Sequence, residues 1–323
     1  MSDFLLPCRR LGGSPIEVSV VGLGCNNFGG RLDADATAAV LEAALAAGIT
    51  LFDTADIYGG RGESERLMGL ALAGKPRESY VLATKFGMDM SGTPGLPNAA
   101  PGSREYVRWA VEGSLTRLGL NRIDLYQYHQ PDGTTPIEET LAALDELVRE
   151  GLVGAIGCSN FSAAQLEEAE RVAGERGFAR FETVQNQYSL LERGIEAEVA
   201  PACVRLGVSI LPFYPLEKGL LTGKYRRGAA APAGTRLAAA GRTETGTDAQ
   251  FDVVEALEEF AAARGIELID VAIAGLAAQP AVASVIAGAT KPEQIAANVA
   301  SARWQPSEED LAELDRLAPT PRR

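Results

Sequence analysis

Apolar, strand-like runs alternate with amphipathic helical stretches along most of this 323-residue chain, and this alternation limits the folds it can form. Eight runs are candidate strands: Val18–Gly24, Thr50–Asp53, Tyr80–Lys85, Ile123–Tyr128, Val153–Cys158, Thr183–Gln187, Val208–Phe213 and Val282–Ala287. Six stretches are candidate helices: Ala34–Ala47, Ser64–Leu72, Arg104–Leu118, Ile137–Glu150, Ala163–Arg176 and Glu192–Leu206. Five of these are followed by a glycine, which readily adopts the left-handed conformation at a helix end.

Strands joined by helical crossovers are expected to be parallel, and eight of them predict an α/β fold, the (β/α)8 barrel. The length suits one barrel domain over residues 1–323. Residues 8–18 are expected to form an N-terminal β-hairpin that closes the barrel floor. Segments 86–103 and 226–248 are long for connections, and we predict that they are loops at the carboxyl face. For 226–248, a disordered surface insertion is an equal alternative.

A doubly wound open sheet is the alternative architecture. It calls for a glycine-rich phosphate loop after the first strand. The segment Gly22–Asn27 carries two of the three glycines of that motif and has asparagine where the third belongs. The barrel is therefore the favoured architecture.

Charge and composition exclude several classes of partner. A formal net charge of −13 argues against broad binding to nucleic acid or anionic membranes, although it allows a local basic pocket. No apolar run is long enough to span a bilayer, and the N-terminus lacks a signal-peptide pattern. Four scattered cysteines and a single histidine make a metal site unexpected. We expect a cytoplasmic protein with reduced thiols.

Polar residues at the carboxyl ends of barrel strands converge on one face. Those ends carry Asp53, Lys85 and His129, and the loop after Asp53 adds Tyr58. A tyrosine hydroxyl has a pKa of about 10, and a neighbouring ammonium stabilises its phenolate. An aspartate would keep that lysine charged, and a histidine would orient a carbonyl oxygen or relay a proton. Each residue alone has a structural explanation, but together they predict an acid–base cluster.

Motifs along about residues 8 to 315 resemble those of the aldo-keto reductase superfamily. They are Asp53–Gly59 with Gly62–Glu65 and Met68-Gly69, Ser114–Leu118 through Ile123–Tyr126 to His129, Ile156–Phe161, Gln185–Ser189, Pro215-Leu216 with Gly219–Tyr225, and Gly288–Gln294 with Asn298. The details look closer to bacterial, sugar-reductase-like and channel-subunit-like members than to the steroid reductases.

The resemblance implies a barrel that binds a nicotinamide cofactor, usually NADPH, and a catalytic tetrad of Asp53, Tyr58, Lys85 and His129 with Tyr58 as the general acid. It implies that Ser159, Asn160 and Gln185 hold the nicotinamide carboxamide, although Ser159-Asn160 would otherwise be interpreted as a helix N-cap. The resemblance also implies that an aromatic ring stacks on the nicotinamide. The register predicts Phe213, and a shift of one residue gives Tyr214. Further cofactor contacts are expected from Leu216, Gly288, Thr290, Lys291, Gln294 and Asn298.

Cofactor preference rests on the pocket for the 2′-phosphate of NADPH. Many NADPH-preferring relatives carry arginine at the position of Thr290. Here the adjacent Lys291 is the available cation, and it is a point charge without the fork of arginine. Lys291 also begins a helix, whose amino end favours phosphate. We predict a preference for NADPH that is weaker than usual and leaves room for NADH.

The sequence thus predicts an NADP(H)-dependent oxidoreductase that interconverts aldehydes or ketones with alcohols. The expected partner is a small carbonyl or alcohol substrate, and neither nucleic acid nor membrane is expected to bind. One alternative is a cofactor-binding regulatory or channel-associated subunit with little turnover. Another is a barrel enzyme with lyase or isomerase chemistry.

Overall fold

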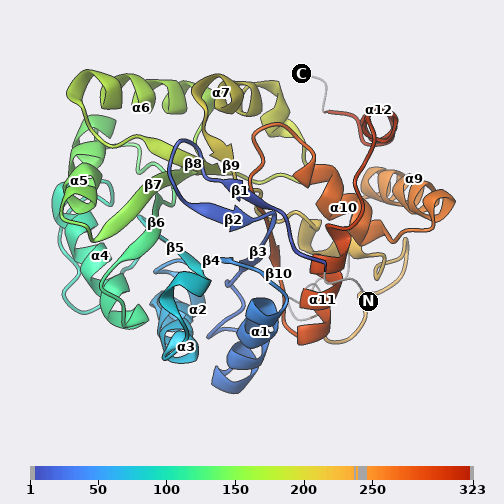
Figure 1. The fold of residues 1–323 in the computed structure, drawn as a ribbon, viewed down its shortest axis with the longest axis horizontal. Coiled ribbons are helices and arrows are strands. Elements are labelled where there is room, and N and C mark those ends of the chain that lie inside the picture. The colour runs from blue at the N-terminus through green and yellow to red at the C-terminus, as the bar shows by residue number, and fades with distance from the viewer. Residues whose placement is uncertain (1–3, 236–237, 239–245, 321–323) are drawn as a thin grey trace.

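Eight parallel strands form one curled sheet in the computed structural model, which describes residues 4–235, 238 and 246–320 (Figure 1). Across the sheet the order is β10 (Val285–Gly288), β3 (Val21–Gly24), β4 (Leu51–Asp53), β5 (Val81–Phe86), β6 (Ile123–Tyr128), β7 (Val153–Ser159), β8 (Phe181–Gln185) and β9 (Ser209–Ile210). Each strand from β3 to β9 lies beside the next one along the chain. All eight predicted strands therefore occur.

The two edges of the sheet meet between β9 and the segment that leads into β10. Ile210 N donates to Ala281 O at 2.7 Å, and Ala283 N donates to Ile210 O at 3.1 Å. Ile286 N adds a bond of 3.2 Å to Pro212 O. These bonds close the sheet into the predicted (β/α)8 barrel. Strand β9 is shorter than the predicted Val208–Phe213, in which Pro212 has no N–H to donate.

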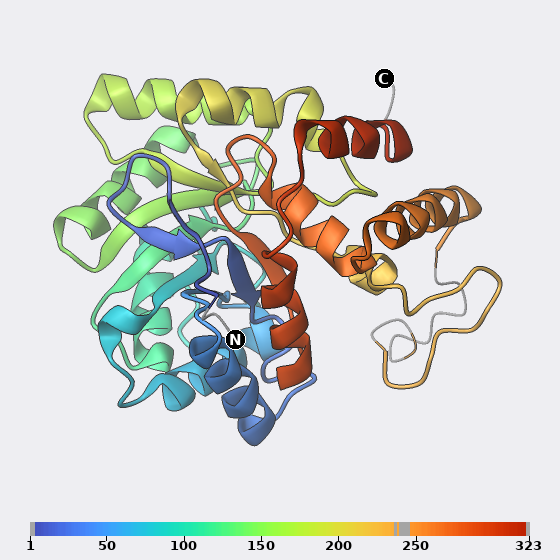
Figure 2. The same ribbon diagram turned by 45° about the vertical axis from the view of Figure 1, so that its right-hand side comes forward.

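Helices cover the outside of the strands (Figures 1 and 2). Those between β3 and β9 are α1 (Ala34–Ala46), the short α2 (Tyr58–Arg61), α3 (Glu63–Leu72), α4 (Arg104–Leu118), α5 (Ile137–Arg149), α6 (Ala163–Arg176) and α7 (Val199–Leu206), with 3-10 turns at Arg77–Ser79 and Gly194–Ala197. A further 3-10 turn, Glu217–Thr222, follows β9. The predicted helix Glu192–Leu206 was wrong at its start, because α7 begins only at Val199. A 3-10 turn precedes α7, because the Arg193 guanidinium binds Glu196 and Asp315 and holds that segment toward the C-terminal helix.

Three helices near the C-terminus were not predicted: α9 (Asp248–Arg264), α10 (Leu268–Ala277) and α12 (Glu308–Leu317). They share a second apolar cluster that includes Leu257, Val271 and Leu314. Helix α10 is apolar on nearly every side, so its sequence carries no helical periodicity. Helix α11 (Pro292–Ser301) begins just after Lys291, where a helix was expected.

An antiparallel hairpin of β1 (Cys8–Arg10) and β2 (Glu17–Ser19) covers the amino end of the barrel. Gly12 N donates to Ser209 Oγ at 2.9 Å, and Gly13 N donates to Glu182 Oε2 at 2.6 Å. Gly12 has φ of +54°, and an added Cβ would lie 2.6 Å from the Glu182 carbonyl oxygen, so this turn requires glycine. The predicted hairpin is confirmed, and the predicted strand from Val18 is divided between β2 and β3. Ligands therefore reach the barrel from its carboxyl end.

Both predicted long loops reach that carboxyl end. Met88 of segment 86–103 and Ala233, Gly234 and Thr235 of segment 226–248 line a cavity there. The rest of the second segment includes residues 236–237 and 239–245, which lie outside the described residues. In the described parts of the chain, no helix has the length and apolar character needed to cross a membrane.

Candidate active site

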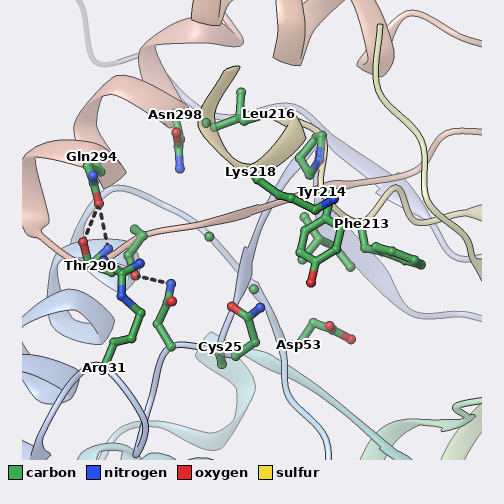
Figure 3. Close-up of a pocket in the computed structure, with 18 of the residues that line it drawn as sticks. Cys25, Arg31, Asp53, Phe213, Tyr214, Leu216, Lys218, Thr290, Gln294 and Asn298 are labelled. Atoms are coloured by element: carbon green, nitrogen blue, oxygen red, sulfur yellow. Dashed lines mark hydrogen bonds between the residues drawn. The ribbon is translucent and has the colours of Figure 1, made fainter. Parts of the chain in front are cut away.

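A cavity of about 770 Å³ opens where the barrel strands end (Figure 3). Its wall is made by strand ends and by the loops that follow them. Of the residues predicted to form the site, all but Lys85 line it: Asp53, Tyr58, His129, Ser159, Asn160, Gln185, Phe213, Leu216, Gly288, Thr290, Lys291, Gln294 and Asn298. Lys85 lies behind the wall and is completely buried.

Lys85 links the buried aspartate to the tyrosine. Its Nζ atom donates to Asp53 Oδ2 at 2.7 Å and to the Thr54 carbonyl at 2.9 Å. The same nitrogen lies 3.5 Å from the Tyr58 hydroxyl oxygen. The other carboxylate oxygen, Asp53 Oδ1, accepts bonds from the amides of Gln127 (3.1 Å) and Gln185 (2.9 Å). These hydrogen bonds and the ion pair with Lys85 hold the Asp53 side chain in place.

A tight turn carries Tyr58 to the cavity wall. Gly59 and Gly60 both have positive φ, and a Cβ on Gly59 would lie 2.6 Å from the Phe28 carbonyl oxygen. The Ser64 hydroxyl ties the start of α3 to the first strand–helix loop, since it donates to Cys25 O at 2.9 Å and lies 2.8 Å from Thr54 Oγ1. The glycines let the chain reverse closely enough for Tyr58 to face Lys85.

Burial and charge act in opposite directions on Tyr58. Burial raises the pKa of its hydroxyl above the usual value, and the Lys85 ammonium offsets part of that rise. Burial alone would lower the pKa of Lys85, but the charges and hydrogen bonds of Asp53 and Tyr58 outweigh it and raise that pKa. At neutral pH the pair is therefore a neutral phenol beside a charged ammonium. That phenol has a proton to donate.

His129 packs edge to face against Tyr58, with ring centroids 5.8 Å apart and an interplanar angle of 82°. Burial, with a smaller contribution from Lys85, lowers the pKa of His129 to about 3. Its imidazole is thus neutral in the physiological range. Its Nδ1 atom is buried with no hydrogen-bond partner among the described residues.

Three amide and hydroxyl side chains form a polar group beside the histidine. Ser159 Oγ donates to Gln185 O at 2.7 Å, and Asn160 Nδ2 donates to His129 O at 3.0 Å and to Ser159 Oγ at 3.1 Å. Asn160 has φ of +60°, a conformation that asparagine tolerates better than most residues. The interpretation of Ser159-Asn160 as the N-cap of α6 is wrong, because Ser162 caps that helix in a capping box with Gln165.

The segment after β9 forms the opposite wall and contains three non-glycine residues with positive φ: Tyr214 (+54°), Glu217 (+40°) and Lys218 (+55°). Each costs roughly 1–2 kcal/mol relative to an ordinary conformation. In Figure 3 the Tyr214 hydroxyl points toward the side of the cavity that holds Asp53, and the Phe213 ring extends away from it. Both rings line the cavity and meet edge to face at 5.3 Å.

In Figure 3 Thr290, Gln294 and Asn298, from α11 and the segment before it, lie on the side of the cavity opposite Asp53. Gln294 Oε1 accepts bonds from Thr290 N (2.7 Å) and Thr290 Oγ1 (3.2 Å). Lys291 is exposed at the N-cap position of α11, and Asn298 is buried about two turns further on. The start of α11 therefore presents a cation and a helix amino end to the cavity.

Sequence reasoning missed four polar residues of the site. Gln127 lies inside β6 and binds Asp53, and the signal was a lone amide in an aromatic and aliphatic strand. Arg31, Lys218 and Lys224 line the cavity from loops. No motif marks Arg31 or Lys218, and Lys224 was given no role although it lies in the motif Gly219–Tyr225, because loop cations are usually solvated.

A second polar cluster lies behind the turn that carries Tyr58. Glu65 is fully buried, accepts a hydrogen bond from Thr84 Oγ1 and pairs with Arg117 Nε at 2.7 Å. Asp56 is also fully buried, and neither of its carboxylate oxygens has a hydrogen-bond partner among the described residues. Burial, reinforced by the nearby Glu65, raises the pKa of Asp56 well above its usual range. Asp56 therefore keeps its proton to a higher pH than an ordinary aspartate.

Comparison with known proteins gives one family. The model of the Aldo/keto reductase family matches residues 20–319. The chain is 35% identical to "Probable aldo-keto reductase 1" of Glycine max, over 96% of this chain and 88% of that protein. It is 36% identical to "Uncharacterized oxidoreductase YrpG" of Bacillus subtilis, over 96% of this chain and 95% of that protein. It is 34% identical to "Probable voltage-gated potassium channel subunit beta" of Oryza sativa subsp. japonica, over 90% of this chain and 89% of that protein.

Proposed function

The chain belongs to the aldo/keto reductase family, and from this premise we propose that it is an NADP(H)-dependent oxidoreductase acting on CH–OH donors. It would interconvert an aldehyde or ketone with the corresponding alcohol. The observation that carries the proposal is the Tyr58 hydroxyl, which lies at the cavity wall 3.5 Å from the buried Lys85 ammonium. A phenol in that position can donate its proton, and the neighbouring ammonium stabilises the phenolate that is left.

The cavity fits a phosphorylated dinucleotide. One end holds the tetrad and the amides of Asn160 and Gln185, which would hold the nicotinamide carboxamide. Phe213 or Tyr214 would stack on the nicotinamide, and Leu216 and Gly288 would contact the cofactor beside it. At the other end Thr290, Lys291 and Gln294 would hold the adenosine phosphate, and Asn298 the adenine. An added Cβ on Gly219 would lie 2.6 Å from Lys224 Nζ, so the absence of a side chain there leaves room for a cation in the wall.

When bound, a reduced nicotinamide supplies a hydride to the carbonyl carbon. Tyr58 donates the proton that the carbonyl oxygen needs, and Lys85 stabilises the resulting phenolate. Asp53 keeps Lys85 charged and placed. His129 is neutral and acts by orienting the carbonyl oxygen through an N–H group, because an imidazole with a pKa of about 3 has no second proton to give at neutral pH. In alcohol oxidation the same groups act in reverse.

The test uses purified protein with a panel of aldehydes and ketones and either NADPH or NADH, followed by the loss of dinucleotide fluorescence. Turnover of at least one carbonyl, with a higher kcat/KM for NADPH than for NADH, is the expected result. Dinucleotide binding without turnover of any carbonyl or alcohol would contradict the reductase function. A clear preference for NADH would contradict the cofactor assignment alone.

A second candidate is a regulatory subunit of the same fold, since the similar protein of Oryza sativa is named as a probable potassium channel subunit beta. Co-purification with a membrane partner, combined with negligible turnover, would favour it. The complete Asp53, Tyr58, Lys85 and His129 set favours the enzyme.

A further inference from the structure

One layer of the barrel interior is polar, and it lies directly on an apolar layer. The apolar layer takes one side chain from each of four neighbouring strands and shares a cluster with Leu11 of the floor hairpin: Leu51, Ala83, Leu125 and Ala155. Two positions further along the same strands stand Asp53, Lys85, Gln127 and Gly157. Because side chains alternate between the two faces of a strand, these positions also face the interior. Gln127 is the one polar side chain of these four that has no place in the tetrad.

The Gln127 amide has a single polar partner among the described residues, the Asp53 carboxylate. Its Nε2 atom donates to Asp53 Oδ1 at 3.1 Å, and the two residues are only 0% and 2% exposed. The other end of the amide, Oε1, is buried with no hydrogen-bond partner in the described part of the chain. Burying an amide that is only partly bonded costs free energy, so an apolar side chain would suit this place as well. The amide is therefore best explained by its bond to Asp53.

Packing against the next two strands directs the Gln127 side chain. The register places Gln127, Gly157 and Thr183 side by side on β6, β7 and β8. An added Cβ on Gly157 would lie 3.2 Å from Gln127 Cγ and would collide with Thr183 Oγ1. The absence of a side chain at Gly157 thus gives the long amide room to lie inside the barrel and reach Asp53.

Two amides bind one oxygen of Asp53 and leave the other oxygen to Lys85. Asp53 Oδ1 accepts bonds from Gln127 and Gln185, whereas Oδ2 accepts from Lys85 at 2.7 Å. The carboxylate cannot turn without breaking these bonds. Gln185 lines the cavity and meets any ligand there, whereas Gln127 lies behind the lining and keeps its bond whatever the cavity holds. Gln127 is therefore the donor on which the orientation of Asp53 depends in every state of the site.

We propose that Gln127 is a positioning residue for carbonyl reduction, which holds the Asp53 carboxylate from inside the barrel and through it fixes Lys85 beside Tyr58. This inference rests on the proposed function and adds to it a residue that does not line the cavity. An amide is suited to this role because it donates a hydrogen bond without carrying a charge. A cation in its place would compete with Lys85 for the same carboxylate.

Loss of the Gln127 donor should make the Tyr58 phenol harder to ionise. Burial raises the pKa of the Tyr58 hydroxyl most, Lys85 lowers it, and Asp53 and Tyr214 raise it, while the His129 ring packs against the phenol. The amide N–H offsets part of the negative charge of Asp53. Without that donor the charge of Asp53 acts more strongly and Lys85 is held less firmly. Both changes raise the pKa of the Tyr58 hydroxyl.

The experiment compares the wild type with Gln127→Met and Gln127→Asn. Methionine keeps the length of the side chain without a donor, and asparagine keeps the amide but is one methylene too short to reach Asp53. Thr183→Val is the matched control, because Thr183 is buried in the same layer and its hydroxyl has no hydrogen-bond partner among the described residues. Circular dichroism first establishes which variants are folded.

Two measurements are made on each folded variant. NMR of protein carrying ¹³C at the tyrosine carbon that bears the hydroxyl follows the ionisation of Tyr58 with pH, and Tyr58→Phe assigns its signal. Steady-state kinetics give kcat and KM for carbonyl reduction. Both Gln127 variants are expected to titrate Tyr58 at a higher pH and to lower kcat by roughly 10-fold, the scale of one lost hydrogen bond to a charged group, with KM nearly unchanged. Thr183→Val should match the wild type in both measurements.

A higher titration pH together with a lower kcat supports the positioning role. A folded Gln127 variant with the wild-type kcat would overturn it. A lower kcat with an unshifted Tyr58 titration would also overturn it, because Gln127 would then support only the fold. A wild type that turns over no carbonyl or alcohol would overturn the proposed function, and the NMR titration would then decide alone whether Gln127 acts on Tyr58.

Discussion

Lys85 Nζ lies 3.5 Å from the Tyr58 hydroxyl oxygen, and no part of the Lys85 side chain is exposed to solvent. A buried ammonium in that position interacts with the phenol far more strongly than it would in water, because little solvent screens the two groups. The first predictions follow from this pair.

Tyr58→Phe should lower kcat for carbonyl reduction by roughly 10²- to 10⁴-fold, because the substitution removes the proton donor and leaves the ring. The dissociation constant for NADPH should stay nearly unchanged. Steady-state kinetics and a fluorescence titration measure the two quantities. Tyr80→Phe is the matched control, since it removes a phenol hydroxyl that lies outside the cavity lining. Turnover at the wild-type rate in Tyr58→Phe would remove this residue from the mechanism.

Lys85→Met should shift the pH profile of alcohol oxidation to higher pH. Oxidation needs the Tyr58 phenolate as a base, and Lys85 lowers the pKa of that hydroxyl against the effect of burial. Without Lys85 the pKa of the Tyr58 hydroxyl rises further, so the increase of kcat begins at a higher pH. Since Lys85→Met leaves Asp53 buried without its cation, circular dichroism must first show a folded protein. The double variant Asp53→Asn/Lys85→Met avoids that unpaired charge, and an unshifted profile in a folded variant would contradict the prediction.

Carbonyl reduction should show no acid-side transition from His129 between about pH 5 and pH 8, the range in which an ordinary histidine titrates. Burial lowers the pKa of His129 to about 3, so the imidazole stays neutral throughout this window. The measurement is kcat/KM for reduction as a function of pH, at constant ionic strength. A transition near pH 6.5 that disappears in His129→Gln would show that the imidazole titrates normally.

Lys291→Ala should weaken NADPH binding by roughly 10-fold and leave NADH binding nearly unchanged, because only NADPH carries the 2′-phosphate. Lys75→Ala is the control, since Lys75 pairs with Glu42 away from the cavity lining. Titration of both dinucleotides separates the two effects. Equal losses for both would mean that Lys291 acts on a group that they share.

Asp56→Asn should raise the free energy of unfolding at neutral pH by an amount on the order of 1 kcal/mol. The pKa of Asp56 is raised in the folded state, so its contribution to stability is complete below about pH 3.9 and is lost as pH rises through the folded pKa. The gain from asparagine should therefore shrink toward zero near pH 4. Chemical unfolding at several pH values measures it.

Asp132→Asn is the matched control, because its effect on the free energy of unfolding at neutral pH is expected to have the opposite sign. The Asp132 carboxylate accepts bonds from the backbone N–H groups of Gly102, Thr134 and Thr135, and these bonds lower its pKa. Its contribution is present at neutral pH and is lost on acidification. Asp132→Asn should therefore destabilise the protein at pH 7. A loss of stability in both variants would contradict the assignment of a neutral Asp56.

Most of the barrel could be predicted from the sequence because its strands are short apolar runs that end in polar residues. Asp53, Lys85 and His129 stand at such ends, and parallel strands bring their ends together. Helix α10 could not be predicted in this way, since its residues are apolar on both sides and give no period. The identity of the ring on the nicotinamide stays a prediction, because Phe213 and Tyr214 both line the cavity.

Apart from Lys291, the cations of the cavity escaped prediction for a different reason. Arg31 and Lys224 come from loops that are far apart in the sequence, and both line the cavity only because the chain folds into the barrel. Nothing in the residues around Arg31 distinguishes it from a solvated surface cation, and the motif that contains Lys224 does not by itself say where that side chain lies. Sequence patterns report which elements form, whereas the sum of charges at one place depends on how those elements are assembled.

The three non-glycine residues with positive φ after β9 have a consequence for engineering. Exchanging Lys218 for glycine would relax the backbone, and a selection for heat resistance alone would favour that exchange. The same exchange would remove a cation from the wall and free a rigid segment to move. At these few residues a gain in thermal stability would therefore come with a loss of ligand affinity. Stabilising substitutions are better placed in helices that do not line the cavity.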